Sequence, residues 1–508
     1  MNESKQRKVG AILSYVSIIV STLVQLVYTP FLIRMLGKSE YGLYSLVYSI
    51  IGYLTVLDLG FGNAIVVYTS KYRAQKKYDE EKKLHGMFKI IFFIIGIIAG
   101  VLGLVLYLLV PNIFSNTMTN AELEKAKIMM IILAFNLFIT FIFSIYSSII
   151  TAYEKFTFQK VMSMLNVLLK PLFMLPLLFL GFKSITMTIV ITIINIFICL
   201  SNYFYCRNKL NIKIRFCGFD KILFKTILGY SIWLFIGSIV DKINWSVDQF
   251  ILGAVCSTAA VSIYSVASQL NNLFLNLSTA ISGVLLPKMT KMVANKASKK
   301  ELTNEMIKVG RIQYFIIFLM CSGLVLFGKQ FIIWWAGSDF VDSYYVALLL
   351  IIPLCFPLIQ NLGLSIMQAM NKYKFKTITT AIMSIFNIII SFYLAKRFGP
   401  IGAASGTAIA LIICNIIIIN IYYNNSIGID VKKFWKEIFM MTIPFMLPVL
   451  VIIIVMNFIR ISGLIGFIIY IFIYVVIYSY ISYCVVMNSY EKKLVNGILN
   501  KVVGVIKK

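Results

Sequence analysis

Residues 87–110 read MFKIIFFIIGIIAGVLGLVLYLLV, a run of 24 residues that contains one charge, Lys89. A helix needs about 20 mainly apolar residues to cross the hydrocarbon core of a bilayer. Similar runs lie near 11–33, 41–69, 127–152, 161–181, 184–205, 225–250, 258–287, 309–328, 342–370, 377–395, 400–423, 438–459 and 462–487. The sequence therefore predicts an all-α polytopic membrane protein with about 14 transmembrane helices.

The composition supports this class and gives an orientation. Of 508 residues, 60% are hydrophobic and 13% are charged, against roughly 45–50% and about 25% in soluble domains. The net charge of +28 would suggest nucleic acid in a soluble chain, but cytoplasmic loops of membrane proteins collect Lys and Arg. With the N-terminus inside, 36 of the 47 basic residues fall on the inner side. We therefore predict cytoplasmic termini and contact with membrane lipids, and no nucleic-acid partner.

Two short patterns recur at a nearly constant spacing. The pattern I-x-x-A-x-x-K-[FY]-x-F occupies 149–158 and 366–375, an offset of 217. Leu-Gly at 36–37 with Tyr-Ser at 44–45 recurs as Leu-Gly at 252–253 with Tyr-Ser at 264–265. Six spans separate the copies, so the halves share one orientation in the membrane. This predicts two six-helix lobes related by a pseudo-two-fold axis along the membrane normal, plus two C-terminal helices.

The spans and the repeat together predict the domain organisation. We expect an N-terminal six-helix lobe over 1–205, a cytoplasmic linker over 206–224, a C-terminal six-helix lobe over 225–423, and two extra helices with a cytoplasmic tail over 424–508. Since no connecting loop exceeds about 25 residues, there is no room for a soluble catalytic domain.

Signatures of catalysis are missing. His85 is the only histidine and lies in a predicted cytoplasmic loop, which excludes histidine-based triads and intramembrane proton relays. Asp79-Glu80-Glu81 is surrounded by lysines and is predicted to be a solvated turn rather than a metal motif. The eight cysteines form no CxxC pair and are predicted to be buried thiols. The sequence predicts no enzyme, no cofactor and no metal.

Ionisable residues inside the predicted spans are few. Each costs about 2.5–3.5 kcal/mol near the bilayer centre, so such residues usually face a cavity or a partner. Lys170 lies in mid-span with Asn166 one turn earlier, and it is either a cavity-facing cation or part of a structural ion pair. Asp58 precedes Gly60 and Gly62, which weaken the helix locally. Its carboxylate either faces a cavity or is satisfied by a neighbouring helix.

Span seven carries the densest polar stripe. It holds Asp241, Lys242, Trp245, Asp248 and Gln249, spaced so that they form two adjoining rows on one helix. Because a lipid-facing helix could not carry this stripe, we predict that it lines the interior between the two halves. Asp248 lies near the outer interface, where solvation is its expected role. Gln25 in span one is the counterpart of Lys242 at offset 217.

Uncharged amides recur in the spans of the second half. They are Gln269, Asn271, Asn272, Asn276, Gln360, Asn361, Asn387 and Asn415. Such amides either hydrogen-bond one helix to another or bind a sugar-rich ligand, and the sequence leaves both alternatives open.

Four segments carry a resemblance to a known family. They are PFLIRMLG at 30–37, EYGLYS at 40–45, LDLGFGN at 57–63 and DQFILG at 248–253. In this order and spacing they resemble bacterial polysaccharide-transport proteins, the oligosaccharide flippases of O-antigen and capsule pathways, over roughly the first 400 residues. These flippases share a superfamily with multidrug exporters and lipid II flippases. The resemblance implies two lobes around a central cavity, alternating access, and transfer of a polyprenyl-pyrophosphate-linked oligosaccharide to the outer leaflet.

The resemblance implies that the polar residues inside the spans form the transport site. The expected substrate-binding residues are Lys170, Lys242, Gln25, Asn166, Trp245 and Gln249, and the expected charge-balancing or ion-coupling residues are Asp58 and Asp241. The implied partners are lipid-linked oligosaccharide, membrane lipids and other polysaccharide-assembly proteins, in the bacterial cytoplasmic membrane. A multidrug or metabolite exporter of the same fold is the alternative. An integral polysaccharide polymerase is disfavoured by the short outer loops.

Overall fold

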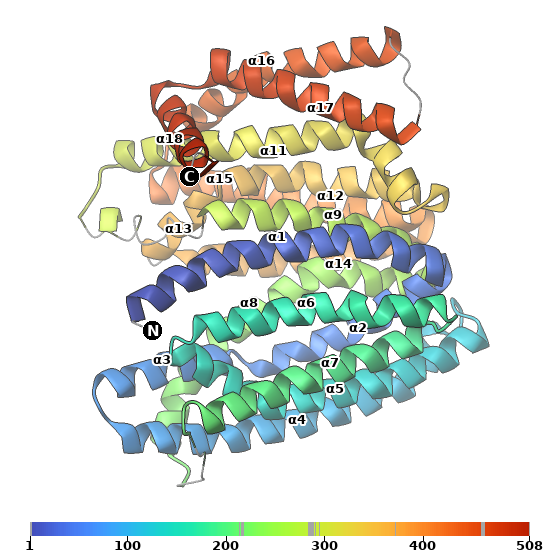
Figure 1. The fold of residues 1–508 in the computed structure, drawn as a ribbon, viewed down its shortest axis with the longest axis vertical. Coiled ribbons are helices and arrows are strands. Elements are labelled where there is room, and N and C mark those ends of the chain that lie inside the picture. Colours follow the sequence, from blue (N-terminus) through green and yellow to red (C-terminus); the bar gives the residue numbers. More distant parts are fainter. Residues whose placement is uncertain are drawn as a thin grey trace. The chain divides into compact units, whose positions relative to one another are not determined.

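The chain folds into long helices (Figure 1). The computed structural model describes residues 3–212, 214, 218–282, 289, 291–293, 295–370, 372–458 and 463–506, and no strand occurs among these residues. Eleven helices are long and apolar enough to cross a membrane. One of them, Tyr373–Ile427, is kinked at Gly399, where φ is 55°, and so corresponds to two predicted spans. With the more polar helices α8 and α9, the described chain contains the fourteen expected spans.

The chain divides into two compact units, and the first comprises Met1–Ser265 and Ile388–Ala403. Its helices are α1 (Glu3–Leu36), α2 (Lys38–Leu54), η1 (Thr55–Asp58), α3 (Phe61–Ala74), α4 (Tyr78–Phe114), α5 (Asn120–Ala152), α6 (Phe156–Phe179), α7 (Ser184–Asn208), α8 (Lys221–Val255) and the start of α9 (Thr258–Ser282). Helix α8 packs against α2 and α3 in this unit. The division into two six-helix lobes with the bounds given above stays a prediction. Residues 213 and 215–217 of the predicted linker lie outside the described residues.

The second unit comprises Val266–Asn387 and Ala404–Lys508. It contains the rest of α9, α11 (Lys299–Trp335), η2 (Ser338–Phe340), α12 (Asp342–Ile359), α13 (Asn361–Ala369), both ends of α14 (Tyr373–Leu411), η3 (Ile412–Ile418), α15 (Ile419–Tyr422), η4 (Tyr423–Ile427), α16 (Val431–Phe458), α17 (Gly463–Ile481), η5 (Ser482–Val486) and α18 (Ser489–Ile506). The end of predicted span eight, 283–287, lies outside the described residues.

The second predicted span is broken in its middle. Helix α2 tightens into η1, and the chain then passes through Leu59 and Gly60, both with positive φ, before α3 begins. The Asp58 carboxylate accepts hydrogen bonds from the backbone N–H groups of Gly60 and Gly62. It thereby satisfies donors that a broken helix leaves without partners. The predicted weakening at these glycines is confirmed.

The repeated sequence pattern folds the same way in both copies. Helix α5 ends at Ala152 and α13 ends at Ala369, each followed by a short turn into the next helix. The backbone N–H of residue 155 bonds to the carbonyl of residue 150, and residue 372 bonds to residue 367 in the same way. Phe158 stacks on Tyr205, and Phe375 stacks on Tyr422, each pair at 3.9 Å between ring centroids. Both stacks keep the offset of 217, which supports the internal duplication.

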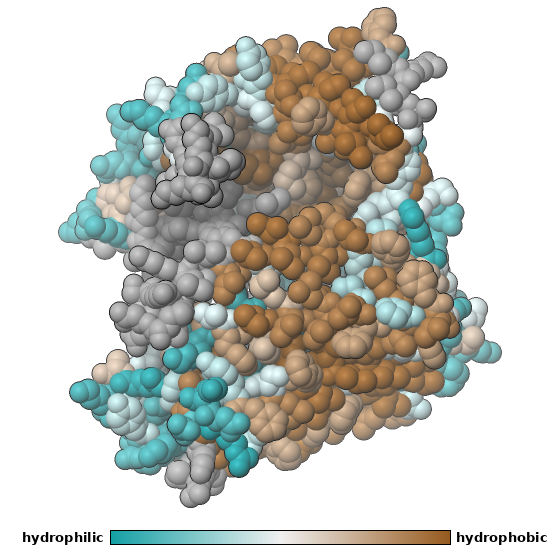
Figure 2. All heavy atoms as spheres, in the orientation of Figure 1, coloured by the Kyte–Doolittle hydropathy of each residue, from teal (hydrophilic) through white to brown (hydrophobic). Residues whose placement is uncertain are grey.

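The surface of the first unit fits a lipid environment. Figure 2 shows hydrophobic residues over the middle of its helices and hydrophilic residues near the helix ends. Along α4, one face exposes large apolar side chains, among them Phe93, Ile97, Val101 and Leu108. A soluble protein rarely leaves so large a contiguous apolar surface uncovered. This surface is therefore the part of the helix that contacts lipid chains.

Candidate functional site

The polar stripe of span seven lies on α8 and is partly accessible. Asp241 and Trp245 are exposed, and Lys242 is partly buried. Gln249 donates from Nε2 to Ser265 Oγ of α9 at 3.2 Å. The expectation that Asp248 is solvated is wrong, because Asp248 is 2% exposed and accepts a hydrogen bond from the Tyr264 hydroxyl. Tyr264 lies on α9, which packs over that end of the stripe and excludes water.

Lys242 lies against the broken second span. A Cβ atom built on Gly52 of α2 would be 3.7 Å from Lys242 Nζ. Gly52 belongs to the last turn of α2, where the helix ends in η1. The C-terminal end of a helix carries partial negative charge from its unsatisfied carbonyl groups. The Lys242 ammonium group therefore lies beside the C-terminal turn of α2, directly before the break in the second span.

The second candidate cation, Lys170, lies on α6, which packs along α1 and α7. Lys170, Asn166 and Gln25 of α1 are all partly buried. Within the described part of the chain, neither Lys170 nor Lys242 forms a hydrogen bond or an ion pair. The structure thus offers no support for the structural ion pair that the sequence left open for Lys170. The role of the two lysines in substrate binding stays a prediction.

The two candidate carboxylates, Asp58 and Asp241, differ in their surroundings. Asp58 is held by the backbone of its own helix break, whereas Asp241 is exposed on α8 and has an interaction partner. Asp58 therefore stabilises the broken span, whether or not it also couples transport to an ion.

Replacing Asp58 by alanine should destabilise the protein by about 1–2 kcal/mol, because two backbone donors lose their acceptor. Asp58→Asn keeps an acceptor oxygen and should recover most of that stability. Thermal unfolding of the purified protein in detergent measures both effects. Equal melting of the Ala variant and the wild type would contradict the capping role, and a stable Asn variant without transport would assign the negative charge to transport.

The amides of the second unit divide into buried and accessible groups. Gln360 is 2% exposed and donates to Asn420 Oδ1, and Asn387 is 1% exposed and accepts from Thr407 Oγ1. These two amides join helices rather than present themselves to a ligand. Asn272 and Asn276 are exposed on α9, one turn apart; Asn276 has an interaction partner, whereas Asn272 is accessible to a polar ligand.

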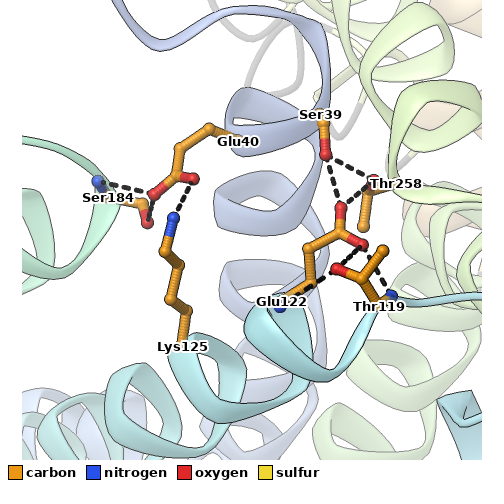
Figure 3. A network of polar contacts seen from close by, with 7 residues as sticks. All are labelled: Ser39, Glu40, Thr119, Glu122, Lys125, Ser184 and Thr258. Carbon is orange, nitrogen blue, oxygen red and sulfur yellow. Dashed lines mark hydrogen bonds and ion pairs between the residues drawn. The ribbon is translucent and has the colours of Figure 1, made fainter.

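A polar network at one end of the first unit was missed by the sequence analysis (Figure 3). Its centre is the Glu122 carboxylate at the start of α5. This carboxylate accepts hydrogen bonds from the Ser39 hydroxyl of α2 and, at 2.7 Å, from Thr258 Oγ1 of α9. It also accepts from the backbone N–H and the hydroxyl of Thr119, both at 2.9 Å. One carboxylate therefore ties three helix starts together.

A second carboxylate, Glu40, extends the network to α7. Glu40 pairs with Lys125 Nζ at 2.7 Å and accepts from Ser184 Oγ at 2.5 Å. Its side chain is 10% exposed, so solvent screens this pair only weakly. Ser184 is the first residue of α7, and a negative charge at a helix start is favoured by the helix dipole. Figure 3 shows both carboxylates pointing toward their partners from neighbouring helix starts.

The network has a consequence for topology. The starts of α2, α5, α7 and α9 all lie on the predicted outer side, and the structure brings all four together. The structure therefore agrees with the prediction that successive spans among the first eight run in alternating directions. Which side of the membrane this end faces stays a prediction. The one sequence signal for the network was Thr119-x-x-Glu122, the pattern of a helix capping box, which the structure contains.

Glu122→Ala should destabilise the protein by about 2 kcal/mol, because the buried Thr258 hydroxyl and the exposed donors of Ser39 and Thr119 lose a charged acceptor. Glu124→Ala is the matched control, since Glu124 is 67% exposed and pairs only with Lys127 on its own helix. That exposed pair contributes about 0–1 kcal/mol. Unfolding of both variants in detergent compares them, and equal losses would refute the bridging role of Glu122.

Two titratable groups of the predicted inner side, His85 and Glu81, are buried and hydrogen-bonded within the protein. His85 is 2% exposed and contacts Thr69 Oγ1 through Nε2 at 3.0 Å. The prediction of a fully solvated acidic turn is wrong for Glu81, which is 4% exposed and accepts from the Tyr153 hydroxyl. Of the seven described cysteines, Cys484 is exposed, so the prediction of buried thiols fails there.

Comparison with known proteins agrees with this architecture. A family model described as polysaccharide biosynthesis protein matches residues 8–293. A relative from Shigella flexneri, named as an O-antigen transporter, is 21% identical over 404 residues, which cover 78% of this chain and 92% of the relative. A protein of the same name from Salmonella typhimurium is 24% identical over 411 residues, with 78% and 91% covered.

Solved structures share the fold. The lipid II flippase MurJ in an inward closed conformation superposes with a TM-score of 0.71 at 20% identity, covering 93% of this chain and 98% of MurJ. A multidrug resistance MATE family transporter in an inward-facing conformation gives a TM-score of 0.64 at 13% identity, covering 82% and 96%. At these identities the likeness concerns the fold and not the transported molecule.

Proposed function

Since the chain belongs to the polysaccharide biosynthesis protein family, we propose that it flips polyprenyl-pyrophosphate-linked oligosaccharide across the membrane. The movement runs from the cytoplasmic to the outer leaflet and serves the synthesis of cell-surface polysaccharide. The chain is a transporter of the bacterial cytoplasmic membrane with both termini in the cytoplasm, and not an enzyme. Its partners are the lipid-linked oligosaccharide, membrane lipids and the proteins that assemble the polysaccharide.

The observation that carries this proposal is the state of the two intramembrane lysines. Lys170 and Lys242 have no hydrogen-bonding or ion-pairing partner among the described residues. A cation at membrane depth is costly unless it meets an anion or a water-filled cavity. A pyrophosphate group supplies that anion, because phosphate oxygens form charge-assisted hydrogen bonds with ammonium groups. The lysines therefore attract the charged part of the substrate while its polyprenyl chain stays in the bilayer.

Neighbouring side chains suit the sugar part of the substrate. Trp245 is exposed on the same helix as Lys242, and sugar rings pack on indole faces through their apolar C–H groups. Gln249, Gln25 and Asn166 supply amide donors and acceptors for hydroxyl groups. Asp241 is exposed beside Lys242 and balances its charge between cycles. Asp58, at the break of the second span, is the second candidate for charge balance or coupling to an ion gradient.

In this proposal, the network of Glu122 and Glu40 holds the outer side of the transporter closed. It joins α2 to the start of α9, and these two helices carry the repeated Tyr-Ser pairs at 44–45 and 264–265. A flippase must close one side while the other is open, since otherwise ions leak across the membrane. Breaking the hydrogen bonds of Glu122 to Ser39 and Thr258 is then the step that opens the outer side.

The test is reconstitution of the purified protein in vesicles with a fluorescent polyprenyl-pyrophosphate-linked oligosaccharide. We expect transfer between leaflets to be at least tenfold faster than in protein-free vesicles. A fluorescent polyprenyl phosphate without sugar and a cationic drug serve as comparison substrates. Transfer of the drug with no transfer of the lipid-linked oligosaccharide would replace this proposal with the exporter alternative.

A further inference from the structure

The last helix, α18, differs from the spanning helices. It covers 18 residues, Ser489–Ile506, and its sequence alternates polar pairs with apolar pairs at helical spacing. The polar pairs are Lys492-Lys493, Asn496-Gly497 and Asn500-Lys501, and the apolar pairs are Leu494-Val495, Ile498-Leu499, Val502-Val503 and Val505-Ile506. This pattern is typical of a basic amphipathic helix that lies in a membrane interface rather than crossing it.

The start of α18 is firmly attached to the rest of its unit. Arg311 of α11 forms a bidentate ion pair with Glu491, at 2.7 and 3.0 Å, and also donates to the Val486 carbonyl. Lys308 lies over the Tyr490 ring at 3.7 Å. Glu491 is the only acidic residue of α18 and is 3% exposed. Because Arg311 neutralises Glu491, the accessible charge of α18 is entirely positive.

The described part of α18 leaves apolar surface uncovered beside this charge. Leu494 is 41% exposed, while Lys493 and Asn496 on the neighbouring positions are exposed as well. A polar and an apolar surface therefore lie next to each other on one helix. A partner for this surface has to offer negative charge and apolar material together.

Further lysines gather at the same end of the second unit. The contacts of Lys433 with Asn304, of the Asp430 backbone with Thr303, and of Lys372 with the Ser426 carbonyl bring the starts of α11, α14 and α16 together. These starts and α18 expose Lys299, Lys300, Lys372, Lys374, Lys432, Lys433, Lys436 and Lys493. Two of the acidic residues at this end, Asp430 and Glu301, accept backbone hydrogen bonds at helix starts, from Lys433 N–H and Ser298 N–H respectively.

We propose that α18 and these helix starts form a docking surface for anionic phospholipid headgroups in the leaflet that faces α18. The exposed lysines contact the phosphates, and Leu494 enters the acyl boundary. Each lysine near an anionic membrane contributes about a fivefold gain in affinity, so several acting together favour the surface-bound helix. The Arg311–Glu491 ion pair connects this lipid-binding helix directly to the spanning helix α11.

Hydrogen exchange on the full-length protein in lipid nanodiscs tests this proposal. In discs of phosphatidylcholine with 30% phosphatidylglycerol, amides of 489–506 should exchange about tenfold more slowly than in discs of phosphatidylcholine alone. The difference should shrink in 0.5 M salt, because salt screens the lysine–phosphate attraction. Glycerol phosphate added to phosphatidylcholine discs should give no protection, since the proposed ligand is the lipid surface and not free phosphate.

Substitutions sharpen the test. The variant Lys492→Gln/Lys493→Gln/Lys501→Gln should lose the protection by phosphatidylglycerol while keeping the unfolding temperature of the wild type. The matched control is Lys183→Gln/Lys329→Gln/Lys396→Gln, which removes three lysines from predicted outer loops and should keep the protection. Equal exchange of 489–506 in both disc types overturns the proposal. Protection by glycerol phosphate alone would also overturn it, because a soluble anion would then be the ligand.

Discussion

Lys242→Ala and Lys170→Ala should each reduce flipping of lipid-linked oligosaccharide about tenfold to hundredfold, and the double variant should be inactive. A charge-assisted hydrogen bond contributes about 1.5–3 kcal/mol, which corresponds to this range in affinity. Neither lysine has a protein partner among the described residues, so its removal should leave no buried carboxylate without a counter-charge. We therefore expect the unfolding temperature of both variants to stay close to that of the wild type.

The measurement is transfer in reconstituted vesicles, together with export of polysaccharide in a strain that depends on this protein. Lys183→Ala is the control, because Lys183 is exposed directly before α7 in a predicted outer loop. Lys242→Arg retains a cation and should restore part of the transport. Normal transport by both alanine variants at normal protein level would refute the cationic site, and the assignment of the substrate would then lose its main support.

Gly42→Ala should disrupt the outer end of the protein and lower transport at least tenfold. A Cβ atom at Gly42 of α2 would be 1.7 Å from the Thr258 carbonyl oxygen and 2.6 Å from its carbonyl carbon. These are backbone atoms, so a change of side-chain rotamer cannot relieve the overlap. Helix α2 and the start of α9 must move apart, which also pulls Ser39 and Thr258 away from Glu122. Overpacking of this kind typically costs about 1–3 kcal/mol.

The control for this variant is Gly100→Ala on α4, where the added Cβ would meet Phe138 at 4.0 Å, an ordinary contact. A disulfide assay reports the geometry directly, using Ser39→Cys with Thr258→Cys, whose hydroxyl oxygens are 3.0 Å apart in the native protein. Cross-linking should be rapid in the native background and slow when Gly42→Ala is added. Unchanged cross-linking and transport in the Gly42→Ala protein would show that this close approach is not needed for the cycle.

Sequence reasoning recovered the features that depend on local composition. The apolar runs located the spans, because each span must bury its backbone polar groups within itself and needs an apolar surface toward lipid. The break of the second span was visible at Gly60, since glycine tolerates the positive φ that the turn requires. The inner turns at 150–155 and 367–372 were recognisable because the same residues recur at offset 217.

Residues whose role depends on a distant partner were harder to interpret. Asp248 was expected to be solvated, yet Tyr264 covers it. Glu122 had only a local capping pattern, while its bonds to Ser39 and Thr258 cross 83 and 136 positions of sequence. Gln360 and Asn272 are both amides in spans, and only their surroundings separate a packing residue from an accessible one.

The sequence by itself determined the membrane class, the approximate positions of the spans, the repeated pattern and the family. These follow from hydropathy, charge and short motifs, each of which is complete within a few dozen residues. Only the tertiary structure decided which polar side chains are satisfied and which are available. The partners of Glu122 lie on other helices, whereas the described helices offer none to Lys170 and Lys242. Pairing of polar groups at membrane depth depends on how helices pack, and packing of fourteen spans cannot be read from any one of them.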